Sequence, residues 1–190
     1  MYKRQFQLRP HTVADQAYIG AYQGIGVGYF NFGNPEELGN PLAVYLFQGG
    51  RIAQFSPRIS LNYEWNFGAS FGWKPYDEYD NPENQIIGSK VNAYLNVNLY
   101  LKWALSPKFD LMIGATGSHF SNGNTQYPNS GLNTVDCKVG LVYNFNRRAD
   151  ELAQSWQHPI VPPFPRHVSY DLTLFGCIFV RHNKMSLSLY

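Results

Sequence analysis

The sequence lacks any long hydrophobic run. None of its windows approaches the roughly 18 consecutive apolar residues that a membrane-spanning helix requires, and its mean hydropathy of −0.33 would ordinarily indicate a soluble protein. A transmembrane β-barrel escapes this test, because only alternate residues of each strand face lipid. The period of the apolar positions is therefore more informative here than their average.

Cysteine is almost absent. Only Cys137 and Cys177 are present, and they form no CxxC motif, so neither a zinc site nor a disulfide scaffold is predicted. The acidic segment 77–83 matches no calcium-loop spacing, and we interpret it as solvated loop charge. The sequence thus implies no metal and no organic cofactor.

Charge is also sparse. Only 15% of the residues are charged, the net charge is +2, and lysine and arginine are scattered along the chain, which gives no support to nucleic-acid binding. Lys3 and Arg4 are followed by no apolar segment, so we expect no secretory signal peptide in these first residues. We expect a single domain over residues 1–190 that could be incomplete at one or both ends, with the native N-terminus upstream.

Glycine and aromatic residues are abundant, with 17 Gly, 14 Tyr, 13 Phe and 4 Trp, which favours β-structure. Residues 91–103 alternate strictly between apolar odd positions and Asn, Tyr or Lys at even positions. Residues 57–73 and 109–121 show the same period, and residues 135–146 break it only at Val142. Weaker or ambiguous alternation covers residues 17–31, 42–55 and 167–180. This period of two predicts strands with one polar and one apolar face.

The connections between these segments alternate in length. Tight turns lie near residues 56 and 106–107, and longer loops cover residues 33–40, 74–85 and 122–132. Outer-membrane barrels have this asymmetry, with short periplasmic turns and long extracellular loops. We therefore predict an all-β, antiparallel transmembrane barrel of about eight strands in the bacterial outer membrane. The pattern reveals seven strands, and the proline-containing segment 147–166 fits neither loop class.

The strand predicted over residues 109–121 carries an apolar face that ends in two polar residues, His119 and Ser121. If that face touches acyl chains, both side chains lie outside the barrel near the edge of the bilayer, where a lipid is the expected substrate. Residues i and i+2 of a strand project to the same side about 7 Å apart. An imidazole nitrogen can then reach the serine hydroxyl, as nucleophilic catalysis requires.

A third residue is expected across the hairpin. A symmetric loop would place Ser121 opposite Asn133 and His119 opposite Val135, so that Asn133 lies diagonal to His119 and can orient the imidazole. Asp136 would stabilise an imidazolium better, but its parity points into the lumen. Parity also predicts that Cys137 faces outward and Cys177 inward, so that the two do not pair.

The run from His119 to Thr125, with the segment from Asn129 to Asn133, resembles the lipid A 3-O-deacylase family, whose bacteroidal relatives are named acyloxyacyl hydrolases. The resemblance covers roughly residues 109–145. It implies an eight-stranded outer-membrane barrel that hydrolyses an ester-linked acyl chain of lipid A with a His-x-Ser pair on its outer wall.

By this resemblance His119 is the general base, Ser121 the nucleophile, and Asn129 an oxyanion-hole residue. A loop glycine is the other expected oxyanion donor. The family has glycine three residues after the serine, where this sequence has Asn124, with Gly123 one residue earlier. The family triad commonly has glutamate where this sequence has Asn133, so a slow or inactive enzyme is an alternative. The candidate site consists of six residues: His119, Ser121, Asn133, Asn129, Gly123 and Asn124.

Three functional hypotheses follow. The first is a serine esterase that removes an acyl chain from lipid A, or lipopolysaccharide, through an acyl-enzyme. The second is a non-catalytic or degenerate outer-membrane barrel with a structural or lipid-binding role. The third is a soluble β-sandwich or barrel, in which the apolar faces would form a core.

Overall fold

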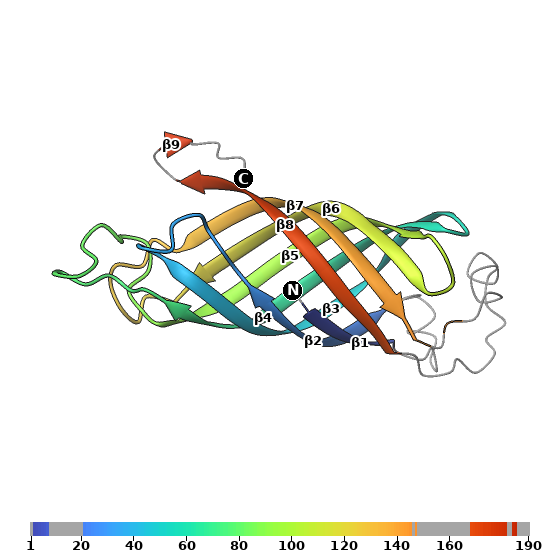
Figure 1. The fold of residues 1–190 in the computed structure, drawn as a ribbon, viewed down its shortest axis with the longest axis horizontal. Helices are drawn as coiled ribbons and strands as arrows, with labels where there is room; N and C mark the ends of the chain where they lie inside the picture. The colour runs from blue at the N-terminus through green and yellow to red at the C-terminus, as the bar shows by residue number, and fades with distance from the viewer. Residues whose placement is uncertain (1, 8–20, 146, 148–167, 182–183, 186–190) are drawn as a thin grey trace.

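The computed structural model describes residues 2–7, 21–145, 147, 168–181 and 184–185. Eight of its strands form a closed antiparallel barrel, in which each strand pairs with its neighbours in the sequence and β1 pairs with β8 to complete the ring (Figure 1). The predicted fold class is confirmed. The strands are β1 Tyr2–Gln7, β2 Tyr22–Tyr29, β3 Gly39–Ser56, β4 Ile59–Trp73, β5 Val91–Ala104, β6 Phe109–Ser121, β7 Leu132–Asn144 and β8 Val168–Arg181, with a short β9 Lys184–Met185 paired to β8.

The strand that the sequence pattern did not reveal is β1. Its visible alternation is poor because Lys3 and Arg4 are adjacent charged residues, although Lys3 is buried in the lumen and Arg4 is exposed on the outer wall. The ambiguous segment 42–55 belongs to β3, which has 18 residues. Register shifts near Arg51 and Gln54 interrupt its pairing with β4, and such irregularities disturb the period of two.

The barrel wall follows the predicted parity. In β5, Leu95, Val97 and Leu99 are exposed, whereas Asn96 and Asn98 between them are buried. This inversion of the soluble pattern is expected where lipid surrounds a barrel and polar groups fill its interior. Among the described residues, no helix is long and apolar enough to cross a membrane.

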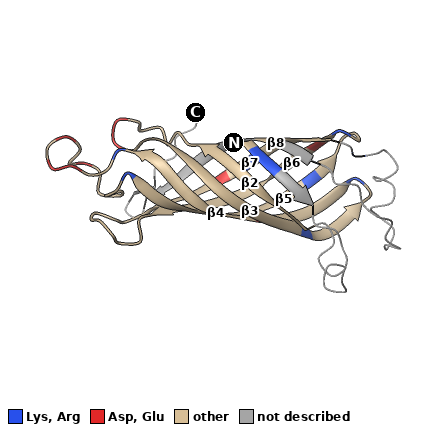
Figure 2. Ribbon diagram, turned by 90° about the horizontal axis from the view of Figure 1, so that it is seen from below, with Lys and Arg blue, Asp and Glu red and all other residues tan. Residues whose placement is uncertain are grey.

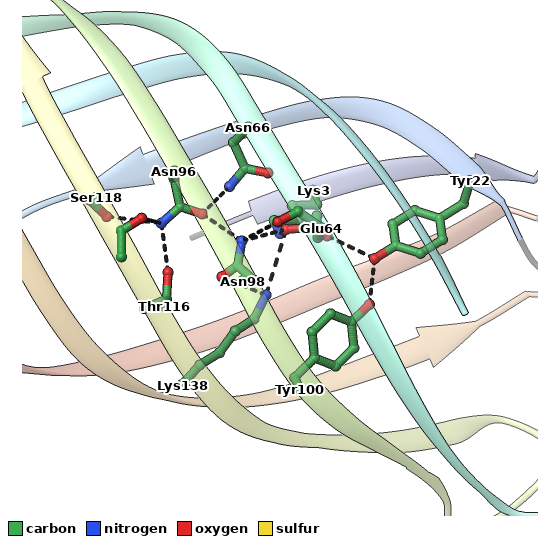
Figure 3. A network of polar contacts seen from close by, with 11 residues as sticks. Lys3, Tyr22, Glu64, Asn66, Asn96, Asn98, Tyr100, Thr116, Ser118 and Lys138 are labelled. Atoms are coloured by element: carbon green, nitrogen blue, oxygen red, sulfur yellow. Dashed lines mark hydrogen bonds and ion pairs between the residues drawn. The ribbon is translucent and has the colours of Figure 1, made fainter. Parts of the chain in front are cut away.

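Charged groups inside the barrel are paired. Glu64 lies at the centre of a network in which Lys3 and Lys138 are its ion-pair partners and the Tyr22 hydroxyl donates to its carboxylate at 3.2 Å (Figure 3). Asn98 links Glu64 and Lys138 through hydrogen bonds of 3.3 Å each. Because Lys3 comes from β1, this network ties the closing strand to β4 and β7 across the lumen.

Toward the long loops the interior of the barrel is no longer polar. It is filled there by a cluster of aromatic and aliphatic side chains. Those loops lie together at one end of the barrel, at the left of Figure 1. Most acidic residues of the described part of the chain lie in these loops (Figure 2). Most of the segment 147–166, which fitted neither loop class, lies outside the described residues.

Candidate active site

His119 and Ser121 lie at the end of β6 on the outer face of the barrel, at the rim that carries the long loops. Phe120 between them points inward and is fully buried. Its ring contacts Trp73 and Tyr94, each at 5.1 Å between centroids. Because side chains alternate along a strand, this anchor turns its two polar neighbours toward the outside.

Both candidate catalytic side chains are half-buried in the outer wall. Leu95 of β5 lies directly opposite His119, and Ala93 lies opposite Ser121. The wall beside the serine is therefore apolar and, at Ala93, free of bulky atoms. A group that reaches Ser121 along this wall contacts hydrocarbon side chains first.

Asn133 of β7 holds the imidazole of His119. Its Oδ1 lies 2.8 Å from Nδ1 of the ring. An amide oxygen can only accept a hydrogen bond, so Nδ1 carries the proton and Nε2 is left as the basic nitrogen. This is the tautomer that a general base needs.

The predicted register of this hairpin is wrong by two residues. His119 pairs directly with Asn133, and Gly117 pairs with Val135. The difference arises because Leu132 belongs to the strand and not to the loop. Leu132 pairs with Phe120 and is buried in the aromatic cluster, and this burial places each residue at the start of β7 two positions farther from the rim along β6 than the symmetric loop would.

Ser121 receives two hydrogen bonds from the β6–β7 loop (residues 122–131). The backbone N–H of Gly123 donates to its Oγ at 3.1 Å, and the side-chain Nδ2 of Asn129 donates at 3.3 Å. Asn129 is itself fixed, because its Oδ1 accepts from the Asn122 N–H at 3.2 Å and its Nδ2 also donates to Asn124 Oδ1 at 3.0 Å. The loop thus directs two donors at the candidate nucleophile.

The loop depends on left-handed backbone conformations. Gly123, Asn124 and Gly131 have φ angles of 66°, 62° and 69°, and glycine and asparagine are the residues that adopt this region most readily. Gly131 also lies against the imidazole, since a Cβ added there would lie 3.1 Å from His119 Cε1. Its lack of a side chain leaves room for the ring.

The β6–β7 loop is supported by the β4–β5 loop, and the sequence did not indicate this contact. The β4–β5 loop (residues 74–90) accepts a hydrogen bond from the Gly131 N–H at its Ile86 carbonyl, at 3.3 Å. Its Gln85 carbonyl accepts from the Ser130 hydroxyl at 3.1 Å. Gly88 packs so closely on the backbone of Tyr127 that a Cβ there would lie 2.8 Å from the Tyr127 carbonyl carbon. No local motif reveals such contacts between loops.

Asp136 is separated from the site, as its parity predicted. Its carboxylate is buried in the lumen and accepts a hydrogen bond from Thr134 Oγ1 at 2.9 Å. Cys137 is exposed and free, as expected. The side chain of Cys177, expected to face inward, lies outside the described part of the structure, although its backbone pairs with Asp136.

The six candidate residues from the sequence therefore gather at one place. A tautomer-fixed imidazole, a serine hydroxyl and two N–H donors are the components of acyl transfer by a serine nucleophile. Asn124 contributes through Asn129 and has no direct contact with Ser121 among the described hydrogen bonds. The partner of the imidazole is a neutral amide, which orients the ring but adds no negative charge.

Comparison with known protein families gives a match. The profile of a family described as lipid A 3-O-deacylase (PagL) matches residues 18–142. The matched region runs from β2 into β7 and contains all six candidate residues. Neither the curated proteins nor the solved structures contain a match.

Proposed function

Because the chain belongs to the lipid A 3-O-deacylase family, we propose that it is a serine esterase that removes an ester-linked acyl chain from lipid A in the outer membrane. The family acts on lipid A as a hydrolase. The observation that carries the finer proposal is that Gly123 and Asn129 donate to Ser121 Oγ, while Asn133 holds the imidazole of His119, two residues before Ser121 on the same face of β6.

The reaction begins with proton transfer. Nε2 of His119 takes the proton of Ser121 as Oγ attacks the ester carbonyl of the lipid. The carbonyl π bond opens, and its electron pair becomes an oxyanion on a tetrahedral intermediate. Gly123 N–H and Asn129 Nδ2, which donate to Oγ in the free protein, are placed to donate to that oxyanion.

The intermediate then expels the sugar oxygen. The imidazolium of His119 gives its proton to this leaving oxygen, so that a sugar hydroxyl departs and the acyl chain stays on Ser121. Water, activated by the neutral imidazole, attacks the acyl-enzyme and releases the fatty acid. The acyl chain can lie along the outer wall of β5, where the exposed residues next to the site are apolar.

A lipid-binding barrel without catalysis is the second candidate, and one observation favours it. Asn133 cannot stabilise the imidazolium by charge, and in a serine protease the corresponding Asp→Asn change lowers kcat by about 10⁴. On this alternative the same outer wall and rim would bind lipid A but leave its esters intact.

Release of fatty acid from lipid A in detergent micelles tests the proposal. We expect the folded barrel to release one fatty acid and Ser121→Ala to release none. Thr125→Ala is the matched control, because it removes an exposed hydroxyl of the same loop that donates to the Asn122 carbonyl and not to Ser121. Equal rates for the Ser121→Ala variant and the unmodified chain, or no release by either, would favour the second candidate.

A further inference from the structure

A pocket opens beside the candidate active site, between the β4–β5 and β6–β7 loops. Its volume is about 410 Å³. It is distinct from the serine and histidine, neither of which lines it. The lining residues are Pro75, Gly88, Ser89, Lys90, Val91 and Gln126.

The pocket has a defined position relative to Ser121. Ala93 of β5 is the pairing partner of Ser121. Val91, which lines the pocket, lies two residues before Ala93 on the same strand, which corresponds to about 7 Å, and Lys90 directly precedes that strand. From the other side, Gln126 belongs to the loop that carries the oxyanion donors, and its carbonyl accepts a hydrogen bond from Asn122 Nδ2 at 2.8 Å. The pocket therefore adjoins the site through both strand and loop.

The charge of the pocket is positive. None of its lining residues is acidic, and Lys90 is exposed and makes no ion pair within the described part of the chain. The other lysine at this rim, Lys74, is paired with Glu36 at 3.6 Å. The Ser89 hydroxyl is directed back to β5, where it donates to the Val91 carbonyl at 2.8 Å. Besides Ser89, Lys90 and Gln126 are the lining residues whose side chains can donate hydrogen bonds.

We propose that this pocket binds a phosphate group of the lipid A headgroup, with Lys90 as its counter-ion and Gln126 as a hydrogen-bond donor. This inference rests on the proposed function for the identity of the lipid. Lipid A carries phosphate on the same sugars that bear its ester-linked chains, so a single molecule can place phosphate in the pocket and an ester at Ser121. Lysine is a common phosphate ligand, and the contact selects which ester reaches the nucleophile.

Binding in the absence of turnover tests the proposal. The protein is the full chain with Ser121→Ala, and the probes are phosphorylated lipid A and dephosphorylated lipid A, each in detergent micelles. Adding Lys90→Gln is expected to weaken binding of phosphorylated lipid A by about tenfold, as loss of one charged hydrogen bond would. Binding of the dephosphorylated lipid should stay within about twofold.

Lys74→Gln is the matched control, because it removes a lysine of the same rim that does not line the pocket. We expect it to leave both affinities within about twofold. Equal losses for the two lysine variants, or an equal loss for the two lipids, would overturn the proposal. Since every protein in this experiment lacks Ser121, its result is independent of whether the esterase proposal holds.

Discussion

At the scale of single residues, the partner of His119 decides how fast the proposed reaction can run. Asn133 Oδ1 fixes the ring at 2.8 Å from Nδ1, so the imidazole has the correct tautomer before substrate arrives. A carboxylate at the same place would also stabilise the imidazolium that forms during attack. The imidazole of His119 is therefore oriented as a catalytic base, but the group that orients it is the neutral amide of Asn133.

Replacing Asn133 with aspartate is expected to raise kcat for fatty-acid release. Asp is nearly isosteric with Asn, so it can keep the contact with Nδ1, and the negative charge can recover part of the roughly 10⁴-fold effect known for a serine triad. We expect a gain of at least about tenfold, measured with lipid A in micelles. The double variant with Ser121→Ala should stay inactive, and an unchanged or lower kcat for Asn133→Asp would contradict the role given to this residue.

Gly131 is the second residue whose identity affects the base. Its φ angle is 69°, and a Cβ would lie 3.1 Å from His119 Cε1, so Gly131→Ala should displace the imidazole. We expect kcat to fall by about tenfold or more, since small displacements of catalytic groups have large effects. Gly33→Ala is the control, because Gly33 has a φ of 73° with no atom near its missing Cβ. Equal activity of the two variants would show that contact with the ring is irrelevant.

At the scale of strands and loops, β6 is positioned by what its inward face buries. Phe120 is fully buried among Trp73, Tyr94 and Phe30, and it orients the two candidate catalytic residues on either side of it. The site is thus built on a strand whose inner face is packed and whose outer face is available to lipid.

Phe120→Ala should destabilise the barrel by about 3–5 kcal/mol, the usual loss for a buried phenylalanine. Urea unfolding in lipid vesicles, followed by tryptophan fluorescence, measures this change. Phe109→Ala at the other end of β6 is the control, because Phe109 faces outward and is 40% exposed. A loss for Phe120→Ala no larger than that for Phe109→Ala would contradict the anchoring role.

The sequence predicts strands well where lipid and lumen impose strict alternation, as in β5. It fails where other forces act. Lys3 and Arg4 conceal β1, because one charge is paired inside the barrel and the other lies outside. The irregular pairing near Arg51 conceals β3. Leu132 shifts the hairpin register, because its burial in the aromatic cluster outweighs the symmetry of the loop.

The candidate site was predictable in part because alternation along the strands determines which side chains face outward. Parity alone places His119, Ser121 and Asn133 on one outward face. The support of the β6–β7 loop by Gln85 and Ile86 was not predictable, because contacts between loops distant in sequence have no local period. The pocket beside Lys90 depends on those contacts and was missed with them.

At the scale of the whole molecule, an ionic network in the lumen connects the closing strand β1 to strands across the barrel. Glu64 receives Lys3 from β1 and Lys138 from β7. Removing one member of a buried ionic network leaves uncompensated charge and typically lowers stability by about 3–5 kcal/mol.

Glu64→Gln should therefore lower the free energy of unfolding by about that amount in lipid vesicles. The triple variant Lys3→Met, Glu64→Leu and Lys138→Met removes all three charges and should recover most of the loss, because well-packed apolar residues can replace a buried network. If Glu64→Gln unfolds at the same urea concentration as the unmodified barrel, the network has no role in closure.

Hydrolysis of lipid A in the membrane is measured by mass spectrometry of lipid A extracted from cells that produce this chain with an export signal, compared with cells that produce its Ser121→Ala variant. If Ser121 is the nucleophile, lipid A loses the mass of one acyl chain only in cells that produce the unmodified serine. Lipid A of unchanged mass in both cultures, with the barrel folded in the outer membrane, would contradict it.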